Sequence, residues 1–322
     1  MEKKPMVILT GPTAVGKTAL SIRLAKEING AVISADSMQV YRHMDIGSAK
    51  IRPEEMQGVK HYLIDILEPE EEFHVVRFVE EAKAALEEIY RNGQIPIIAG
   101  GTGFYIQALL YDINFDGQDC DADYRRELEQ IAEEKGAEYL HQMLEEVDAE
   151  SAKAIHANNT KRVIRALEFY HVSGKKISAH NETEHQKESP YNFAYFVLTD
   201  ERERLYKRIE ALYRRIDERI DEMMKEGLLE EVQNLKNMGY HRGMVSMQGL
   251  GYKEILAYLD GEISLERAVY LIKRDTRHFA KRQLTWFRRE RDVIWFDKEQ
   301  YAYQEDAILA DMLTILKEKA IL

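Results

Sequence analysis

The chain has 322 residues, 45% of them hydrophobic and 32% charged, and a formal net charge of −12 at pH 7. These values are typical of a globular protein with one large or two modest domains. No apolar run approaches the roughly 18 residues of a membrane span, so we predict no membrane partner. The single cysteine, Cys120, excludes a disulfide framework and a cysteine-based zinc site. Because Met1–Pro5 leads directly into an apolar run, we expect no signal peptide and a cytoplasmic location.

Strands and helices alternate through the first hundred residues. Apolar runs predict strands at 6–10, 31–34 and 95–99, and helical spacing predicts helices from Lys17 to about Asn29 and over 74–91. This alternation predicts a parallel sheet whose functional loops lie at the carboxyl ends of the strands.

The loop after the first strand, GPTAVGKT at 11–18, matches the phosphate-binding pattern G-x-x-x-x-G-K-[ST]. Gly11 and Gly16 let the backbone approach phosphate oxygens closely, and the loop N–H groups and the helix N-terminus supply partial positive charge. Lys17 adds a full charge, and the Thr18 hydroxyl is placed to hold Mg²⁺. The motif predicts a polyphosphate site without deciding which polyphosphate binds.

The pattern changes after about residue 113. Residues 121–176 predict charged helices, 177–192 a loop and 193–198 a strand; they are followed by helices at 203–226, 264–290 and 305–319 and a strand at 293–296. We therefore predict an α/β fold, a P-loop parallel sheet flanked by helices with an inserted all-helical module. The catalytic core comprises 1–115 and 193–322 in this prediction, and the insert 116–192.

Two further loops at the same edge of the sheet carry candidate functional residues. Asp36 follows the second strand, where a carboxylate can accept a proton from a substrate, or merely cap the next turn. Gln39 has an amide that can recognise the edge of a base. Thr102 lies on a glycine-rich turn that brings a hydroxyl close to a ligand. Helix 203–226 carries Arg204, Arg208, Arg214 and Arg215. We expect most of them to be solvated and one or two to reach a leaving diphosphate.

Charge is segregated along the chain. Residues 121–150 hold eleven acids against three bases, whereas 273–291 hold eight bases against two acids. Residues 161–176 carry five bases and one acid. Such segregation is common on solvated helix faces, but it also allows an acidic protein to bind a polyanion through basic stretches.

The ordered set of motifs resembles the bacterial type of the tRNA dimethylallyltransferase (tRNA isopentenyltransferase) family, over about residues 6–297. The matching blocks are GPTAVGKT at 11–18, DSMQVY at 36–41, MDIGSAK at 44–50, HYLID at 61–65, GGT at 100–102, IH at 155–156, KRVIRALE at 161–168, GLGYKE at 249–254 and KRQLTWF at 281–287.

The resemblance implies transfer of a dimethylallyl group from dimethylallyl pyrophosphate to the exocyclic amine of the adenosine 3′-adjacent to the tRNA anticodon, with release of pyrophosphate. Pyrophosphate would occupy the loop formed by Gly11, Pro12, Thr13, Ala14, Val15, Gly16, Lys17 and Thr18. Mg²⁺ on Thr18, together with Lys17, would neutralise the leaving group. The resemblance further implies that Arg208 contacts pyrophosphate, that Asp36 accepts a proton from the attacking amine or orients it, and that Thr102 steadies the adenine or the donor.

The implied partner is the anticodon stem-loop of tRNA, with the target base flipped out of its stack. The insert would clasp the stem-loop, and we expect the protein to be a monomer. The resemblance assigns tRNA contacts to Asp36, Ser37, Met38, Gln39, Thr102, Arg125, Lys161, Arg162, Val163, Ile164, Arg165, Gln248, Gly249, Leu250, Gly251, Tyr252, Lys253, Lys281, Arg282 and Gln283.

Three alternatives share the phosphate loop. A P-loop small-molecule kinase leaves the insert and the basic 273–291 helix without a role. An isopentenyltransferase acting on free adenine nucleotides uses the same chemistry but needs no tRNA-contacting segments. A GTP switch is disfavoured because the chain has no Asn-Lys-x-Asp guanine-recognition motif.

Overall fold

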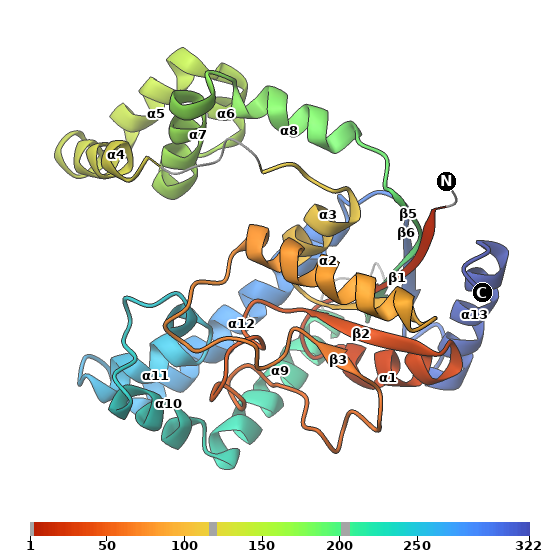
Figure 1. The fold of residues 1–322 in the computed structure, drawn as a ribbon. Helices are drawn as coiled ribbons and strands as arrows, with labels where there is room; N and C mark the ends of the chain where they lie inside the picture. Colours follow the sequence, from red (N-terminus) through yellow and green to blue (C-terminus); the bar gives the residue numbers. More distant parts are fainter. Residues whose placement is uncertain (1–2, 116–120, 201–206) are drawn as a thin grey trace. The chain divides into compact units, whose positions relative to one another are not determined.

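In the computed structural model, which describes residues 3–115, 121–200 and 207–322, six strands form one parallel sheet (Figure 1). Their order across the sheet is β3-β2-β4-β1-β5-β6. The strands are β1 (Lys4–Thr10), β2 (Gly30–Ala35), β3 (His61–Tyr62), β4 (Ile95–Gly100), β5 (Tyr191–Thr199) and β6 (Val293–Asp297).

Burial on both faces of β1 explains why its sequence is a continuous apolar run. Val7 and Leu9 join a cluster that includes residues of α1 (Lys17–Glu27) and α13 (Glu305–Glu318). Met6 and Ile8, which are also fully buried, therefore point to the opposite face of the sheet. Helices thus cover the sheet on both sides, which confirms the predicted α/β fold.

Other helices pack around the sheet and against one another. Helices α2 (Val75–Arg91) and α3 (Gly103–Leu110) pack against each other and against β2. Helix α12 (Leu265–Phe287) packs against α3, α9 (Lys207–Glu226) and α11 (Tyr252–Leu259). Helix α10 (Leu228–Asn237) and the short 3₁₀ helix η1 (Ser246–Gln248) lie between α9 and α11 in the chain.

The chain divides into two compact units. The core unit consists of residues Met1–Leu110 and Pro190–Leu322, and the helical unit of Tyr111–Ser189, compared with the predicted insert at 116–192. The helical unit contains α4 (Ala122–Lys135), α5 (Ala137–Val147), α6 (Ala149–Ala154), α7 (Thr160–Ser173) and α8 (Ile177–Gln186). Its apolar core includes Leu128, Leu140, Leu144, Val163 and Leu167.

The predicted loop at 177–192 is wrong over its first ten residues, which form α8. Polar residues such as Ser178 and Thr183 favour loops in isolation, because their side chains compete for backbone hydrogen bonds. Here Asp148, which is buried, accepts hydrogen bonds from the backbone N–H and the hydroxyl of Ser178, at 3.0 and 2.7 Å. This long-range contact satisfies the first turn of α8 and stabilises the helix.

Within the described part of the chain, no helix combines the length and the apolar character needed to cross a membrane.

Replacing Asp148 should loosen the helical unit. Its carboxylate also accepts hydrogen bonds from the N–H and hydroxyl of Ser151, so Asp148→Ala leaves four donors without their acceptor. We expect the free energy of local unfolding of α6–α8 to fall by about 2–3 kcal/mol, measured by amide hydrogen exchange. Glu150→Ala, which removes an exposed ion pair with Lys153 on the same helix, is the control and should change it by less than about 0.5 kcal/mol.

Candidate active site

The phosphate loop adopts a conformation that only glycine permits at two positions. Gly11 has φ +149°, and a Cβ there would lie 2.4 Å from the carbonyl oxygen of Leu198. Gly16 has φ +95° and precedes α1 without a side-chain cap, so the first N–H groups of α1 are left for a ligand. Lys17 bends back over the loop, where its Nζ donates to the carbonyl oxygens of Gly11 and Pro12 at 3.0 and 2.8 Å.

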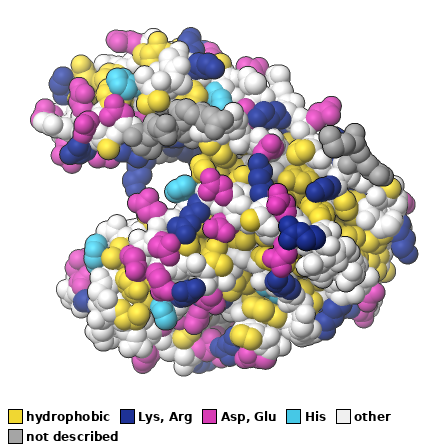
Figure 2. All heavy atoms as spheres, viewed as in Figure 1, with side chains coloured by type: hydrophobic (Ala, Val, Ile, Leu, Met, Phe, Trp, Pro, Cys, Tyr) yellow, Lys and Arg dark blue, Asp and Glu magenta, His cyan; other side chains and the backbone are white. Residues whose placement is uncertain are grey.

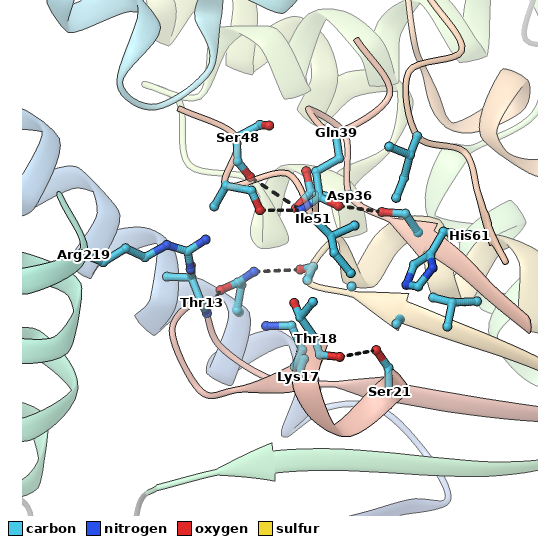
Figure 3. Close-up of a pocket in the computed structure, with 18 of the residues that line it drawn as sticks. Thr13, Lys17, Thr18, Ser21, Asp36, Gln39, Ser48, Ile51, His61 and Arg219 are labelled. Carbon is cyan, nitrogen blue, oxygen red and sulfur yellow. Dashed lines mark hydrogen bonds between the residues drawn. The ribbon is translucent and has the colours of Figure 1, made fainter. Parts of the chain in front are cut away.

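Two adjoining cavities open at the carboxyl ends of the strands. The phosphate-loop cavity, about 120 Å³, is lined by Lys17 and Thr18 among others (Figure 3). The larger cavity, about 490 Å³, is lined by predicted tRNA-contacting residues and by apolar side chains. Thr13, Asp36 and Arg219 line both cavities, so Asp36 lies at their junction.

The charges at this junction are close enough to perturb one another. Burial raises the pKa of the Asp36 carboxyl, while the Met38 N–H that donates to it at 2.9 Å and the Lys17 ammonium oppose that rise. Burial and the nearby Arg219 guanidinium lower the pKa of Lys17 to about 7, with Asp36 acting in the opposite direction. The pocket therefore contains two cations and one carboxylate, an arrangement suited to an anionic ligand.

Among the arginines of α9 whose side chains the structure describes, Arg219 lines both cavities, and the sequence analysis did not single it out. Its Nη1 donates to the Thr13 hydroxyl at 3.4 Å, and its side chain extends toward the phosphate loop (Figure 3). Leu212, Ile216 and Ile220 are buried on the same helix. Arg219 is three residues from Ile216, which places it on this inward face, and that spacing is the signal that could have identified it.

Of the arginines proposed from the sequence, the two whose side chains the structure describes, Arg214 and Arg215, do not line the cavities. Arg214 is exposed and pairs with Glu218, and Arg215 pairs with the buried Asp200. Arg208 falls in α9, but its side chain lies outside the part that the structure describes, as does all of Arg204.

Gln39 turns its amide toward its own loop. Its Oε1 accepts from the Ser34 hydroxyl at 3.1 Å, and its Nε2 faces the carbonyl oxygens of Ser48 and Ala49 at 3.5 and 3.3 Å. The amide thus stabilises the cavity wall, and recognition of a base by Gln39 would require these hydrogen bonds to break.

Four residues with predicted tRNA contacts have buried side chains, which is a correction to those predictions. Val163 and Ile164 belong to the apolar core of the helical unit, because they occupy the inner face of α7. Tyr252 is fully buried and Gln283 is 6% exposed. In this structure the side chains of Val163, Ile164 and Tyr252 are therefore not accessible to RNA, and Gln283 is already engaged within the protein.

Most of the other predicted contacts lie either on the helical unit or around the larger cavity. Lys161 and Arg162 are exposed on α7, whereas Arg125 lies 3.7 and 3.6 Å from the carboxylates of Glu129 and Glu168. On the face that Figure 2 shows, basic and acidic side chains are interspersed, so the negative net charge does not make the whole surface negative. Around the larger cavity the structure brings together Asp36, Ser37, Met38, Thr102, Gln248, Gly249, Leu250, Gly251, Lys253 and Arg282.

Comparison with known proteins identifies the family. The family model described as IPP transferase matches residues 39–290. The chain is 60% identical over 319 residues to a tRNA dimethylallyltransferase of Lachnoclostridium phytofermentans, covering 99% of both chains. It is 50% identical over 303 residues to one of Acetivibrio thermocellus, covering 94% of this chain and 95% of the relative. The chain belongs to the IPP transferase family.

Solved structures of this family agree with the fold. The full-length tRNA isopentenylpyrophosphate transferase of Bacillus halodurans superposes with a TM-score of 0.72 at 44% identity, covering 99% of this chain and 98% of that one. A eukaryotic dimethylallyltransferase acting on tRNA gives a TM-score of 0.72 at 32% identity, covering 88% and 69%. The resemblance drawn from the sequence motifs is confirmed.

In this IPP transferase family member, Glu231 of α10 fixes one wall of the cavities. Its carboxylate accepts hydrogen bonds from the backbone N–H groups of Asp45, Ile46 and Gly47 at 2.9, 2.8 and 3.1 Å, and from the Tyr252 hydroxyl at 2.8 Å. A Cβ on Gly47 would lie 2.6 Å from the Tyr252 ring, so only glycine allows this approach. We call this set of hydrogen bonds the Glu231 clamp. It holds residues 45–47, and the next two residues, Ser48 and Ala49, line both cavities.

Removing this clamp should free the 45–49 loop. We expect Glu231→Ala to lower the free energy of unfolding by about 2–4 kcal/mol, because four donors lose their acceptor. Amide exchange at 45–47 should accelerate in the same variant. Glu230→Ala, at an exposed position on the same helix, is the control, and equal effects of the two substitutions would contradict the clamp.

Proposed function

We propose that this protein transfers a dimethylallyl group from dimethylallyl pyrophosphate to the exocyclic amine of the adenosine 3′-adjacent to a tRNA anticodon, releasing pyrophosphate. The relatives named tRNA dimethylallyltransferase, which match nearly the whole chain, support this activity. The structural observation that carries it is the position of Asp36 at the junction of the two cavities, beside the phosphate loop.

The two cavities suit two different substrates. The phosphate-loop cavity offers the N-terminus of α1, the Lys17 ammonium and the Arg219 guanidinium to a diphosphate. The larger cavity has room for a flipped purine, and its apolar residues include Ile216, Ile220 and Phe279. A donor in the first cavity and a base in the second meet at Asp36.

Asp36 has the chemistry needed to handle the amine. The lone pair of an exocyclic amine is delocalised into the purine ring, so the amine is a weak nucleophile and must be aligned with the allylic carbon at about 3–3.5 Å. The carboxylate accepts a hydrogen bond from the amine and takes its proton as the N–C bond forms. The allylic C–O bond breaks as this bond forms, and its electron pair leaves with the diphosphate. Lys17, Arg219 and the loop N–H groups stabilise the charge that develops there.

Mg²⁺ fits the site as an ion shared with the substrate. Among residues 3–115, 121–200 and 207–322 no cluster of three or more His, Cys, Asp or Glu side chains could hold a metal by itself. Mg²⁺ commonly takes one or two protein oxygens and completes its shell with phosphate oxygens and water. We therefore propose that the Thr18 hydroxyl holds it against the diphosphate, where it supplies positive charge to the leaving group.

One assay separates this function from its alternatives. The protein is incubated with dimethylallyl pyrophosphate, Mg²⁺ and either unmodified tRNA or AMP, and separately with ATP. We expect prenylation of tRNA only, detected as a mass gain of a single adenosine next to the anticodon. Prenylation of AMP but not tRNA would favour the free-nucleotide enzyme, and ATP-dependent phosphorylation of a small molecule would favour a kinase.

Loss of Arg219 should weaken both donor binding and leaving-group stabilisation. We expect Arg219→Gln to lower kcat/KM for dimethylallyl pyrophosphate by about 100-fold, because a fixed charge in the cavity is lost. Arg214→Gln on the exposed side of α9 is the matched control and should stay near wild type. Equal losses in both variants would assign the effect to α9 as a whole.

The pH profile should report the ionisation of Asp36. A base must be ionised, so kcat/KM falls as pH drops through its pKa, and burial raises that pKa above the ordinary carboxyl value of about 4. Asp36→Asn should lower the rate by about 10²–10⁴-fold and abolish this acidic limb. Its tRNA affinity should stay within several-fold of wild type, and an unchanged acidic limb in Asp36→Asn would exclude the base role.

The exposed pair Lys161 and Arg162 should account for part of the salt dependence of tRNA binding. Each phosphate contact releases counterions, so the double variant Lys161→Gln, Arg162→Gln should flatten the slope of log K against log salt by about 1.5–2. Filter binding at several salt concentrations measures it. An unchanged slope would show that neither residue contacts the RNA backbone.

A further inference from the structure

Gln283 of α12 joins the two loops that form the catalytic edge. Its Oε1 accepts a hydrogen bond from the backbone N–H of Thr13 in the phosphate loop at 2.9 Å. Its Nε2 donates to the carbonyl oxygen of Gly101, next to Thr102, at 3.0 Å. These loops follow β1 and β4 and lie 270 and 182 residues from Gln283 in the chain. The parent strands already pair at Thr10 and Gly100, and the Gln283 amide adds a link between the two loops beyond the ends of these strands.

Both the oxygen and the nitrogen of the Gln283 amide form hydrogen bonds, and the neighbouring residues leave space for the amide. Thr13 N–H can only donate and the Gly101 carbonyl can only accept, so one orientation of the amide satisfies both. The side chain is 6% exposed. A Cβ at Gly101 would lie 2.1 Å from Gln283 Nε2, and a Cβ at Gly103 would lie 2.2 Å from the Trp286 ring. Glycine at both positions lets the Thr102 loop approach α12 closely.

These two hydrogen bonds of the Gln283 amide, the Gln283 bridge, act on residues at the junction of the two cavities. Thr13 lines both cavities and accepts a hydrogen bond from Arg219, and Thr102 lines the larger one. Misplacement of reacting groups by about 1 Å can cost two orders of magnitude in rate. A side chain that fixes the separation of Thr13 and Thr102 therefore controls the alignment of donor and acceptor.

We propose that Gln283 is a positioning residue for prenyl transfer, whose amide holds the phosphate loop and the Thr102 loop in register, and that it does not contact tRNA. The inference rests on the proposed function, since it concerns the alignment of the two substrates of that reaction.

The first test is Gln283→Met, which keeps an unbranched side chain and removes both hydrogen bonds. We expect kcat to fall about 10- to 100-fold while the tRNA dissociation constant stays within about twofold. Hydrogen exchange at Thr13 N–H should accelerate, a readout that does not depend on activity. Thr285→Ala, at an exposed position two residues further along α12, is the control and should leave all three measurements unchanged.

The second test is Gln283→Glu, which separates the two halves of the bridge. Its carboxylate can still accept from Thr13 N–H but repels the Gly101 carbonyl oxygen, and a protonated carboxyl can donate to that oxygen again. The activity of Gln283→Glu relative to wild type should therefore rise as pH falls from about 8 to about 5.5, because burial and the carbonyl raise the pKa of this carboxyl. The ratio of Gln283→Met activity to wild-type activity should not change with pH.

The possible outcomes are distinguishable. If wild type does not prenylate tRNA, the proposed function fails, whatever the variants do. If wild type is active and Gln283→Met keeps its kcat, or loses tRNA affinity with kcat unchanged, the positioning role is overturned. A flat pH ratio for Gln283→Glu with intact folding would also overturn it.

Discussion

The site depends on the electrostatic relation between Asp36 and the two cations beside it. A half-buried carboxylate is costly unless opposite charge lies near, and Lys17 and Arg219 supply that charge. The same two cations repel each other in the partly buried space, and burial with this repulsion lowers the pKa of Lys17 to about 7. In the proposed function, a diphosphate bound between them would relieve this repulsion. The arrangement is therefore suited to bind an anion, and it places a carboxyl group where the proposed reaction would need a proton acceptor.

The fold creates this arrangement by placing the ends of β1, β2 and β4 next to one another. Because the strands are parallel, the phosphate loop, Asp36 and Thr102 emerge at one edge, in the strand order β2-β4-β1. Helices α9 and α12 then add Arg219 and Gln283 from far along the chain. Loops alone would leave these groups mobile. Hydrogen bonds to Glu231 fix the 45–47 segment to α10, and those of Gln283 fix the phosphate loop and the Thr102 loop to α12.

The sequence predicted those features that are encoded locally. Apolar runs ending in Gly11, Asp36 and Gly100 were sufficient to predict three adjacent strands and the functional edge of the sheet, but the two-residue strand β3 was missed. The ordered motifs were sufficient to predict the family. Features that depend on contacts between distant residues were missed. The helix at Ile177–Gln186 depends on Asp148, some 30 residues upstream. Arg219 was overlooked among several arginines of one helix, although its spacing from the buried Ile216 places it on the inward face. The motif around Gln283 does not reveal that its amide faces inward.

The most direct measurement is a crystal structure with an unreactive thio-diphosphate analogue of dimethylallyl pyrophosphate and Mg²⁺. The account predicts the diphosphate on the loop N–H groups, Lys17, Thr18 and Arg219. It also predicts the allylic carbon facing the Asp36 carboxylate at about 6 Å, which leaves room for one amine nitrogen between them. A diphosphate bound away from the phosphate loop, or an allylic carbon pointing away from Asp36, would contradict the account.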